Sequence, residues 1–194
     1  MDFNCKKLKK SDGNINLMFS YMALTIVALL VAYSIANNKI SILKNKVEDA
    51  LILSTLASAT IDLKEYAQSG AIVNIDSKDV KSSYSAFLST LKKNLSLNDD
   101  LSLKKDSFIT GKIKIEKFII YSDVDSHIEV NEALNGSLST SQVGKGAITP
   151  NGKKIEDTTI YAKLSFKLNV MGSEFDVSKD NVVRVTEKSK DAFR

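Results

Sequence analysis

The stretch "NINLMFSYMALTIVALLVAYSIANN", from Asn14 to Asn38, contains no charged residue. Its apolar core runs from Leu17 to Ala36, and a helix of twenty residues measures about 30 Å, the thickness of the hydrocarbon core of a bilayer. Because lipid offers no hydrogen-bond partner to an open backbone, a helix is the expected form. We therefore predict a transmembrane helix over residues 14–38.

The residues before this segment predict its orientation. Four lysines lie in a basic leader over residues 1–13: Lys6, Lys7, Lys9 and Lys10. The positive-inside rule then places the N-terminus in the cytoplasm and the chain after Lys39 outside it, as a single-pass membrane protein with an extracytoplasmic C-terminal domain. A cleaved secretory signal ending at Ser34–Ala36 is the alternative, but its apolar region is usually only about 7–15 residues long.

The helical pattern does not stop at the membrane boundary. No glycine or proline occurs from Asn14 to Ser69, so we expect the helix to continue over residues 39–70 and to end near Gly70. Its predicted apolar stripe consists of Ile40, Leu43, Val47, Ala50, Leu51, Ser54, Leu56, Ala57 and Ile61. Two separate helices are one interpretation; we favour a single helix of more than fifty residues, with a bend near Asn37 and Asn38.

Residues 71–194 predict an extracytoplasmic α+β domain with one packing helix and a mainly antiparallel sheet of about four to six strands. The helix is expected from Ser77, a possible N-cap, to Leu97. The residues from Ile160 to Val170 alternate strictly between apolar and polar, which predicts a strand with one buried face. A turn over Met171–Glu174 then leads into a returning strand, which completes a hairpin.

Further strands are predicted upstream of that hairpin, over residues 111–124 and 127–134, where isoleucine and aromatic residues are frequent. The segment from Ser137 to Asp157 is predicted to be a long polar loop, with a turn at Pro150–Gly152. The fold class is thus α+β, with a long N-terminal transmembrane and amphipathic helix, one packing helix and a mainly antiparallel C-terminal sheet.

Composition excludes several classes of protein. Charged residues make up 26% and hydrophobic residues 43% of the 194 residues, which is typical of a folded chain. The net charge is +4 and tryptophan is absent, and no basic stripe is interleaved with aromatics, so we expect no nucleic-acid partner. Cys5 is the only cysteine, so no intramolecular disulfide can form.

Few residues in the sequence are of a type and spacing that suit catalysis or metal binding. His127 is the only histidine and lies in a polar turn. Asp123, Asp125 and Glu129 resemble a calcium loop faintly, but the glycine and the distal glutamate of an EF-hand are missing. Five residues separate Gly146 from Gly152, where a phosphate loop has four. We therefore expect no catalytic residue, no metal site and no cofactor, and we do not expect an enzyme.

A basic leader, a glycine and an apolar helix, in that order, resemble a prepilin. More specifically, the segment from Lys6 to Glu65 resembles the TadE-like minor pilins and pseudopilins of tight-adherence (Flp-type, type IV pilus-related) systems. Their pattern is a glycine, four residues, a glutamate, then Phe or Tyr and an apolar run. Here Gly13 is the glycine and Phe19 the aromatic residue, while Met18 occupies the position of the glutamate.

The resemblance implies processing and partners. A prepilin peptidase would cut after Gly13 and leave Asn14 as the new N-terminus, and the partners would be the membrane, other pilin subunits and pilus assembly proteins. In related pilins the buried glutamate is thought to pair with a neighbouring subunit's N-terminal amine. Met18 removes that acceptor, which leaves a tip subunit, a different docking mode, or a protein that never enters a filament.

The function expected from the resemblance is structural. The chain would be a minor pilin or pseudopilin-like subunit of a pilus or secretion filament at the cell surface, with a tip or initiating position as one option. The alternative is a single-pass anchored extracytoplasmic binding domain.

Overall fold

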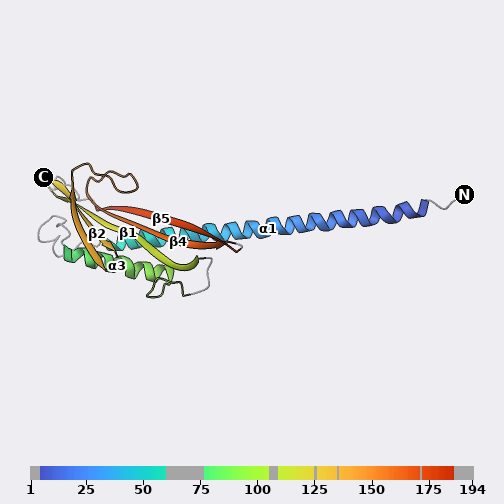
Figure 1. Cartoon of the computed structure of the whole chain (residues 1–194), viewed down its shortest axis with the longest axis horizontal. Helices are drawn as coiled ribbons and strands as arrows, with labels where there is room; N and C mark the ends of the chain where they lie inside the picture. Colours follow the sequence, from blue (N-terminus) through green and yellow to red (C-terminus); the bar gives the residue numbers. More distant parts are fainter. Residues whose placement is uncertain are drawn as a thin grey trace, which may run out of the picture. The chain divides into compact units, whose positions relative to one another are not determined.

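The computed structural model describes residues 5–59, 77–104, 109–124, 126–134, 136–170 and 172–185. The chain divides into two compact units, Met1–Ile42 and Leu43–Arg194. The described residues form a long N-terminal helix, a second helix and a five-stranded antiparallel sheet (Figure 1). The predicted α+β fold class is therefore confirmed.

Helix α1 is continuous over 54 residues, Cys5–Ser58. The prediction of one helix, rather than two, is thus confirmed, and the backbone remains helical through Asn37 and Asn38. The helix begins within the basic leader, because no residue between Cys5 and Gly13 breaks a helical backbone. The predicted end at Gly70 and the stripe residue Ile61 lie outside the described residues.

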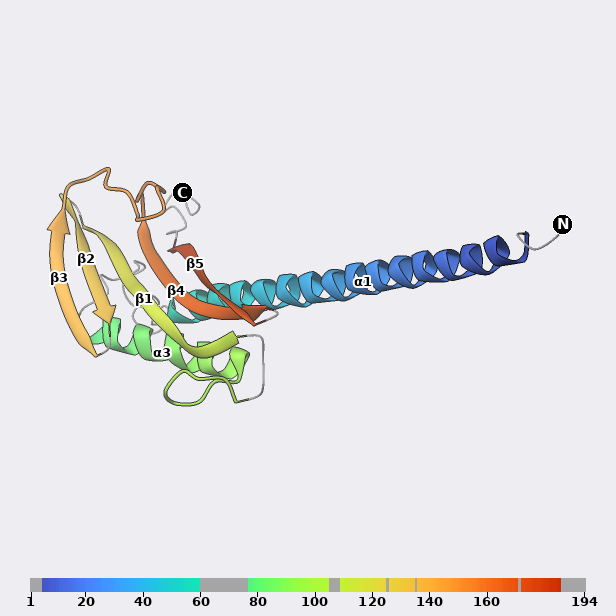
Figure 2. The same ribbon diagram turned by 45° about the vertical axis from the view of Figure 1, so that its right-hand side comes forward.

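The strands follow the order β3-β2-β1-β4-β5 across the sheet (Figure 2). Their bounds are β1 Ile109–Val124, β2 His127–Leu134, β3 Ser137–Val143, β4 Thr158–Val170 and β5 Ser173–Val185. The predicted hairpin is confirmed, because β4 and β5 pair from Thr158↔Val185 to Val170↔Ser173. Its turn is shorter than predicted: Ser173 and Glu174 already belong to β5, and Gly172 takes the positive φ of 85° that a two-residue turn requires.

The prediction of a single polar loop over Ser137–Asp157 is wrong in its first part. Residues 137–143 form the edge strand β3, which pairs with β2 from Leu134↔Ser137 to Ile128↔Val143. Its polar side chains misled the prediction because they are mostly exposed, whereas the strand is held by backbone pairing with β2. The turn within the remaining loop is confirmed: the Gly152 amide donates to the Thr149 carbonyl at 2.8 Å.

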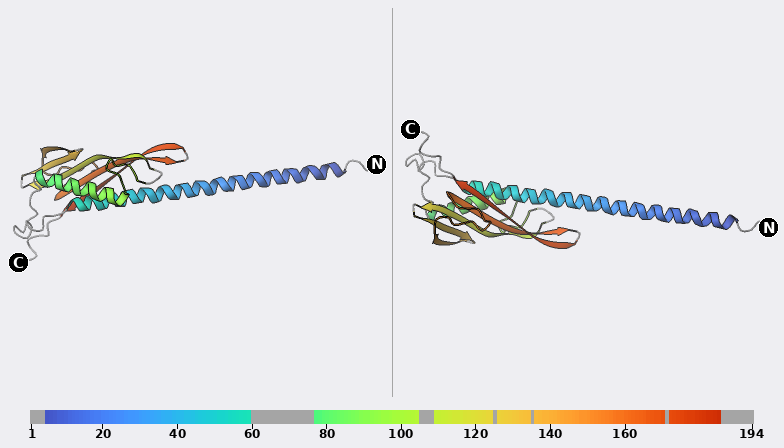
Figure 3. Two further views of the ribbon diagram at one scale, coloured as in Figure 1. Left: turned by 90° about the horizontal axis from the view of Figure 1, so that it is seen from below. Right: turned by 90° about the horizontal axis from the view of Figure 1, so that it is seen from above.

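The main core lies between one face of the sheet and two helical segments, α3 (Ser77–Leu95) and the last turns of α1 (Figure 3). The Phe118 ring of β1 contacts Phe87 and Tyr84 of α3, with ring centroids 5.1 and 5.3 Å apart. Alternate residues of β4 are buried on this face, as predicted: Ile160, Ala162, Leu164, Phe166 and Leu168. Val170 is only half-buried at the end of the strand.

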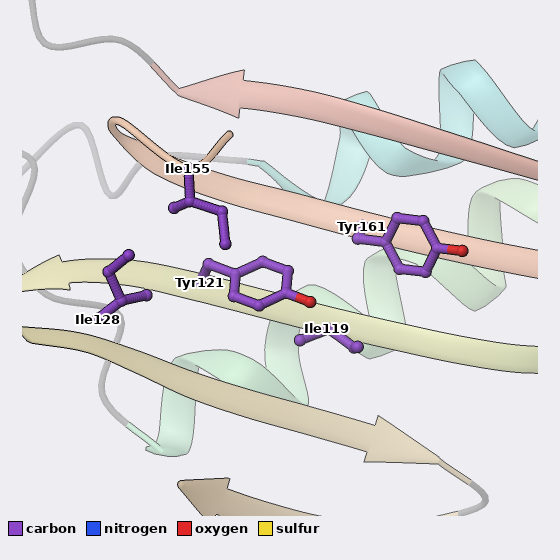
Figure 4. Close-up of a cluster of buried hydrophobic side chains, with 5 residues drawn as sticks. All are labelled: Ile119, Tyr121, Ile128, Ile155 and Tyr161. Carbon is purple, nitrogen blue, oxygen red and sulfur yellow. The ribbon is translucent and has the colours of Figure 1, made fainter. Parts of the chain in front are cut away.

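A second, smaller cluster is buried on the opposite face of the sheet. Figure 4 shows its side chains in front of the sheet while the helices lie behind it: Ile119, Tyr121, Ile128, Ile155 and Tyr161. Ile155 comes from the loop that follows β3, and an ion pair between Lys145 and Asp123 fastens that loop to β1. β4 is predicted to have one buried face, but Thr159 and Tyr161 on its other face are buried too, and Tyr161 packs with Ile155 of that loop.

The last turns of α1 belong to the unit Leu43–Arg194, which we call the sheet domain. They bury a stripe of small and apolar residues: Val47, Ala50, Leu51, Ser54, Thr55 and Ser58. These positions repeat every three or four residues, as one helix face requires. Leu56 was predicted to share this stripe but is 49% exposed, because it lies on a different face. Glu48 forms an ion pair with Lys179 of β5, on the same side of the sheet.

Candidate functional site

The uncharged stretch of α1 from Asn14 to Asn38, which we call the apolar segment, is the most distinctive feature of the described residues. It lies within the one described helix that is long and apolar enough to cross a membrane, with a mean hydropathy of 2.1 over its most apolar window, none of which is buried within the protein. Large apolar side chains are exposed along it, among them Leu17 at 66% and Leu24 at 70%. So much exposed apolar surface is typical of a contact with lipid or with other protein chains.

Two hydroxyl side chains within the segment bond to the helix's own backbone. The Ser20 hydroxyl donates to the Asn16 carbonyl at 2.9 Å, and the Thr25 hydroxyl donates to the Tyr21 carbonyl at 2.9 Å. A hydroxyl that bonds to the carbonyl one turn earlier needs no water. These two residues therefore add little to the free energy of moving the segment from water into an apolar environment.

The structure places the residues of the prepilin-like motif in one continuous stretch of helix. Gly13 and Asn14 lie in α1, together with the leader lysines Lys6, Lys7, Lys9 and Lys10. Met18 and Phe19 are exposed, at 73% and 64%. Asn14 and Met18 are four residues apart, so they share one face of the helix about one turn from each other.

This spacing defines what position 18 can do chemically. If the chain began at Asn14, its amine would lie on the same helix face as the side chain of residue 18. A carboxylate at that position would accept a hydrogen bond from an amine and would pair with its charge. The Met18 thioether carries no charge and is only a weak acceptor, so it offers no such contact.

Sequence reasoning missed a hollow of about 720 Å³ in the sheet domain. It is lined by residues of β1, β4 and β5, including Lys114, Glu116, Ser165, Lys167 and Glu174. It forms where the β1–β4 register shifts between Thr110 and Lys114 and again between Ile115 and Lys117. The local sign of this irregularity is the positive φ of Gly111. Because that angle is a property of the folded backbone, the sequence alone did not reveal the hollow.

Two glutamates of this hollow, Glu116 and Glu174, are each paired with a lysine of its lining. Glu116 accepts a hydrogen bond from Ser165 at 2.6 Å and lies 3.1 Å from the Lys114 ammonium. The Ser165 bond first, and then Lys114, hold the pKa of Glu116 below its ordinary value. Glu174 is paired with Lys167 at 3.3 Å.

Of the remaining candidate residues, His127 of β2 pairs with Val124 of β1, and Asp125 lies outside the described residues. Among the residues that the structure describes, no group of three or more His, Cys, Asp and Glu side chains is placed to hold a metal ion. Gly152 and Lys154 belong to the loop over the second cluster, where Lys154 bridges to Ile148 in a small hairpin.

Comparisons with models of protein families, with curated proteins and with solved structures gave no match to this chain. The features of this chain that point to a function are the geometry of α1 and its sequence motif.

Proposed function

We propose that this chain is a structural subunit of the minor-pilin or pseudopilin class, in a tight-adherence-type pilus or secretion filament. The observation that carries the proposal is the composition of α1. One helix joins a basic leader with a glycine at its end, an exposed apolar segment, and a buried stripe that packs in a sheet domain. A subunit that is stored in a membrane and then packs into a helical filament core needs these parts in this order.

In this proposal the membrane holds the subunit before assembly. The lysines of the leader keep the N-terminus in the cytoplasm, and the sheet domain lies outside. A prepilin peptidase cuts between Gly13 and Asn14 on the cytoplasmic side. The apolar segment then leaves lipid for contacts with the apolar helices of other subunits, so its exposed side chains stay in an apolar environment throughout.

Met18 gives the subunit a particular place in the filament. A subunit stacked beneath another needs an acceptor for that subunit's N-terminal amine, and a carboxylate in an apolar environment is stable only when it is paired. Met18 has neither the charge nor the need for a partner. We therefore assign the chain to a tip or initiating position, where only a few copies are needed.

A second candidate function is a permanent single-pass anchor for an extracytoplasmic binding domain. Met18 is also the observation that favours it, since an apolar side chain exposed on a transmembrane helix is suited to lipid. In that case Gly13 has no role in processing, and the sheet domain acts at the membrane surface.

The N-terminus of the protein purified from membranes that contain a prepilin peptidase tests the proposal. Mass spectrometry should find a chain that begins at Asn14. Gly13→Leu should remain full length, because the peptidase site needs a small residue, whereas the matched control Gly13→Ala should still be cut. An intact Met1 in the unaltered chain would favour the permanent anchor.

Two further measurements separate the candidates by location. Protease added to intact spheroplasts should degrade the sheet domain; its protection, while a known exterior protein is digested, would refute the orientation. Filaments sheared from the cell surface should contain the chain in substoichiometric amounts. If all copies stay in the membrane fraction, the anchor is favoured, and abundance equal to that of the major subunit would contradict the tip assignment.

A further inference from the structure

The two edges of the sheet differ in how they are protected. Figure 2 shows β3 at one margin of the sheet and β5 at the other. Exposed edge strands usually carry charges, prolines or bulges that prevent pairing with another chain. β5 follows this rule with five charged residues: Glu174, Asp176, Lys179, Asp180 and Arg184. One of them, Lys179, is also paired with Glu48 of α1.

β3 has none of these protections. Its sequence, "SLSTSQV" over residues 137–143, contains no charge and no proline. Seven successive residues pair with β2 without a register shift, so the strand is regular along its whole length. No strand among the described residues pairs with its outer edge, and all of its side chains except Leu138 are exposed. The outer edge thus offers a straight row of backbone donors and acceptors.

We propose that β3 is a self-association edge, on which the β3 strand of a second copy of this chain pairs in antiparallel orientation. Charge favours a second copy as the occupant. Identical strands in antiparallel pairing place like residues near each other, and like charges there are destabilising. β3 is uncharged and meets itself without repulsion, whereas two β5 strands would bring several charges together.

The side chains of β3 also fix a register for this pairing. Centred on Thr140, the pairing places Thr140 opposite its counterpart, with Ser139 opposite Ser141 of the second copy on each side. The central Thr–Thr pair is among the favourable cross-strand contacts of antiparallel sheets. The Thr140 hydroxyl already donates to Asn131 at 2.7 Å, and its lone pairs remain able to accept from the facing strand.

The resulting dimer is closed and modest in size. A two-fold axis through Thr140, perpendicular to the sheet, keeps the helices of both copies on the same face of a ten-stranded sheet. Each copy uses the same edge, so the contact ends with two chains. One pair of seven-residue strands buries little apolar surface, so the contact is weak between free chains. It strengthens where a membrane or a filament holds two copies close together.

Disulfide cross-linking of the full chain in detergent micelles tests the register. With Cys5→Ser as background, Thr140→Cys should form a covalent dimer on mild oxidation, because directly opposed residues lie about 4.5–5.5 Å apart, within disulfide reach. Ser139→Cys alone should not, since its counterpart is a diagonal neighbour about 7–8 Å away. Mixing Ser139→Cys chains with Ser141→Cys chains should restore the cross-link. Ser178→Cys on β5 serves as the opposite-edge control.

A charge exchange tests whether the strand pairing, rather than α1, holds the copies together. In the mixed Ser139→Cys and Ser141→Cys experiment, Thr140→Lys in both chains should abolish the cross-link. Thr140→Lys in one chain and Thr140→Asp in the other should restore it. Equal cross-linking at Ser178→Cys or at Ser139→Cys alone, or a yield that ignores the charges at residue 140, would overturn the proposal, as would absence of any dimer. The test does not depend on whether the leader is cleaved.

Discussion

Two regions of α1 reverse the usual relation between hydrophobicity and burial. In the apolar segment, Leu17 and Phe19 are 66% and 64% exposed. In the last turns of the same helix, Ser54 and Thr55 are fully buried against the sheet domain. The polar hydroxyls are inside the protein, and the large apolar side chains are outside it.

The difference shows that the two regions answer to different surroundings. Ser54 and Thr55 tolerate burial because each hydroxyl donates to the helix's own backbone, at 2.6 Å to Ala50 and 2.7 Å to Leu51. Their small size also lets the helix approach the sheet closely. The most apolar window of the exposed segment has no residue buried among those that the structure describes, and so much exposed apolar surface is typical of a contact with lipid or with other protein chains.

The largest difference is expected in the free energy of unfolding, when the loss of a buried aromatic ring of the sheet domain is compared with the loss of an exposed ring of the apolar segment. Phe118→Ala removes a fully buried ring and should lower the free energy of unfolding by about 3–5 kcal/mol. Phe19→Ala should change it by less than about 0.5 kcal/mol, because that ring is largely exposed. Urea unfolding of the full chain in micelles, followed by tyrosine fluorescence, measures both; similar losses would show that the apolar segment supports the domain.

A lysine placed in each of the two regions of α1 should have different effects on the free energy of membrane insertion. Val27→Lys puts a charge at the centre of the apolar segment and should oppose membrane insertion by about 2.5–3.5 kcal/mol. Leu53 is also about half exposed, at 51% against 58% for Val27, but it lies in the sheet domain, so Leu53→Lys should leave insertion unchanged. The inserted fraction of each variant in a membrane insertion assay gives these values, and equal insertion would argue against a transmembrane segment.

Two serines with the same local hydrogen bond allow a finer test. Ser54→Leu enlarges a fully buried residue and should destabilise the domain by about 1–3 kcal/mol. Ser54→Ala should cost less than about 1 kcal/mol, because it removes only a bond to the helix's own backbone. Ser20 makes the equivalent bond in the exposed segment, so Ser20→Leu should leave domain unfolding unchanged. A destabilising Ser20→Leu would contradict the separation of the two regions.

The smallest effect is expected in the pH dependence of stability, through the tyrosines buried on the second face of the sheet. Burial raises the pKa of Tyr121 to about 12, whereas an unfolded tyrosine titrates near pH 10. The fold therefore favours the neutral phenol, and this contribution to stability is complete below about pH 10 and declines as the pH rises toward about 12. Tyr121→Phe should make the decline shallower, leaving the part due to Tyr161, whose pKa is also raised by burial.

Unfolding free energies measured across this alkaline range decide the point. Parallel declines in the unaltered chain and in Tyr121→Phe would show that the loop over residues 144–157 does not keep the ring from solvent.

The sequence by itself determined the parts of this protein whose signal is local. An uncharged run of apolar residues specifies a helix, and the strict alternation from Ile160 to Val170 specifies a strand beside a turn that contains Gly172. The resemblance to a prepilin motif at Gly13 and Met18 likewise rests on one short stretch of the sequence. None of these depends on residues far away in the chain.

Only the tertiary structure decided the features that join distant segments. β3 is polar and became recognisable as a strand only through its backbone pairing with β2. Tyr161 is buried because a loop folds over it, and the hollow beside Glu116 exists because β1 shifts register against β4. Such contacts depend on which segments become neighbours in space, and the local period of a sequence does not encode that choice.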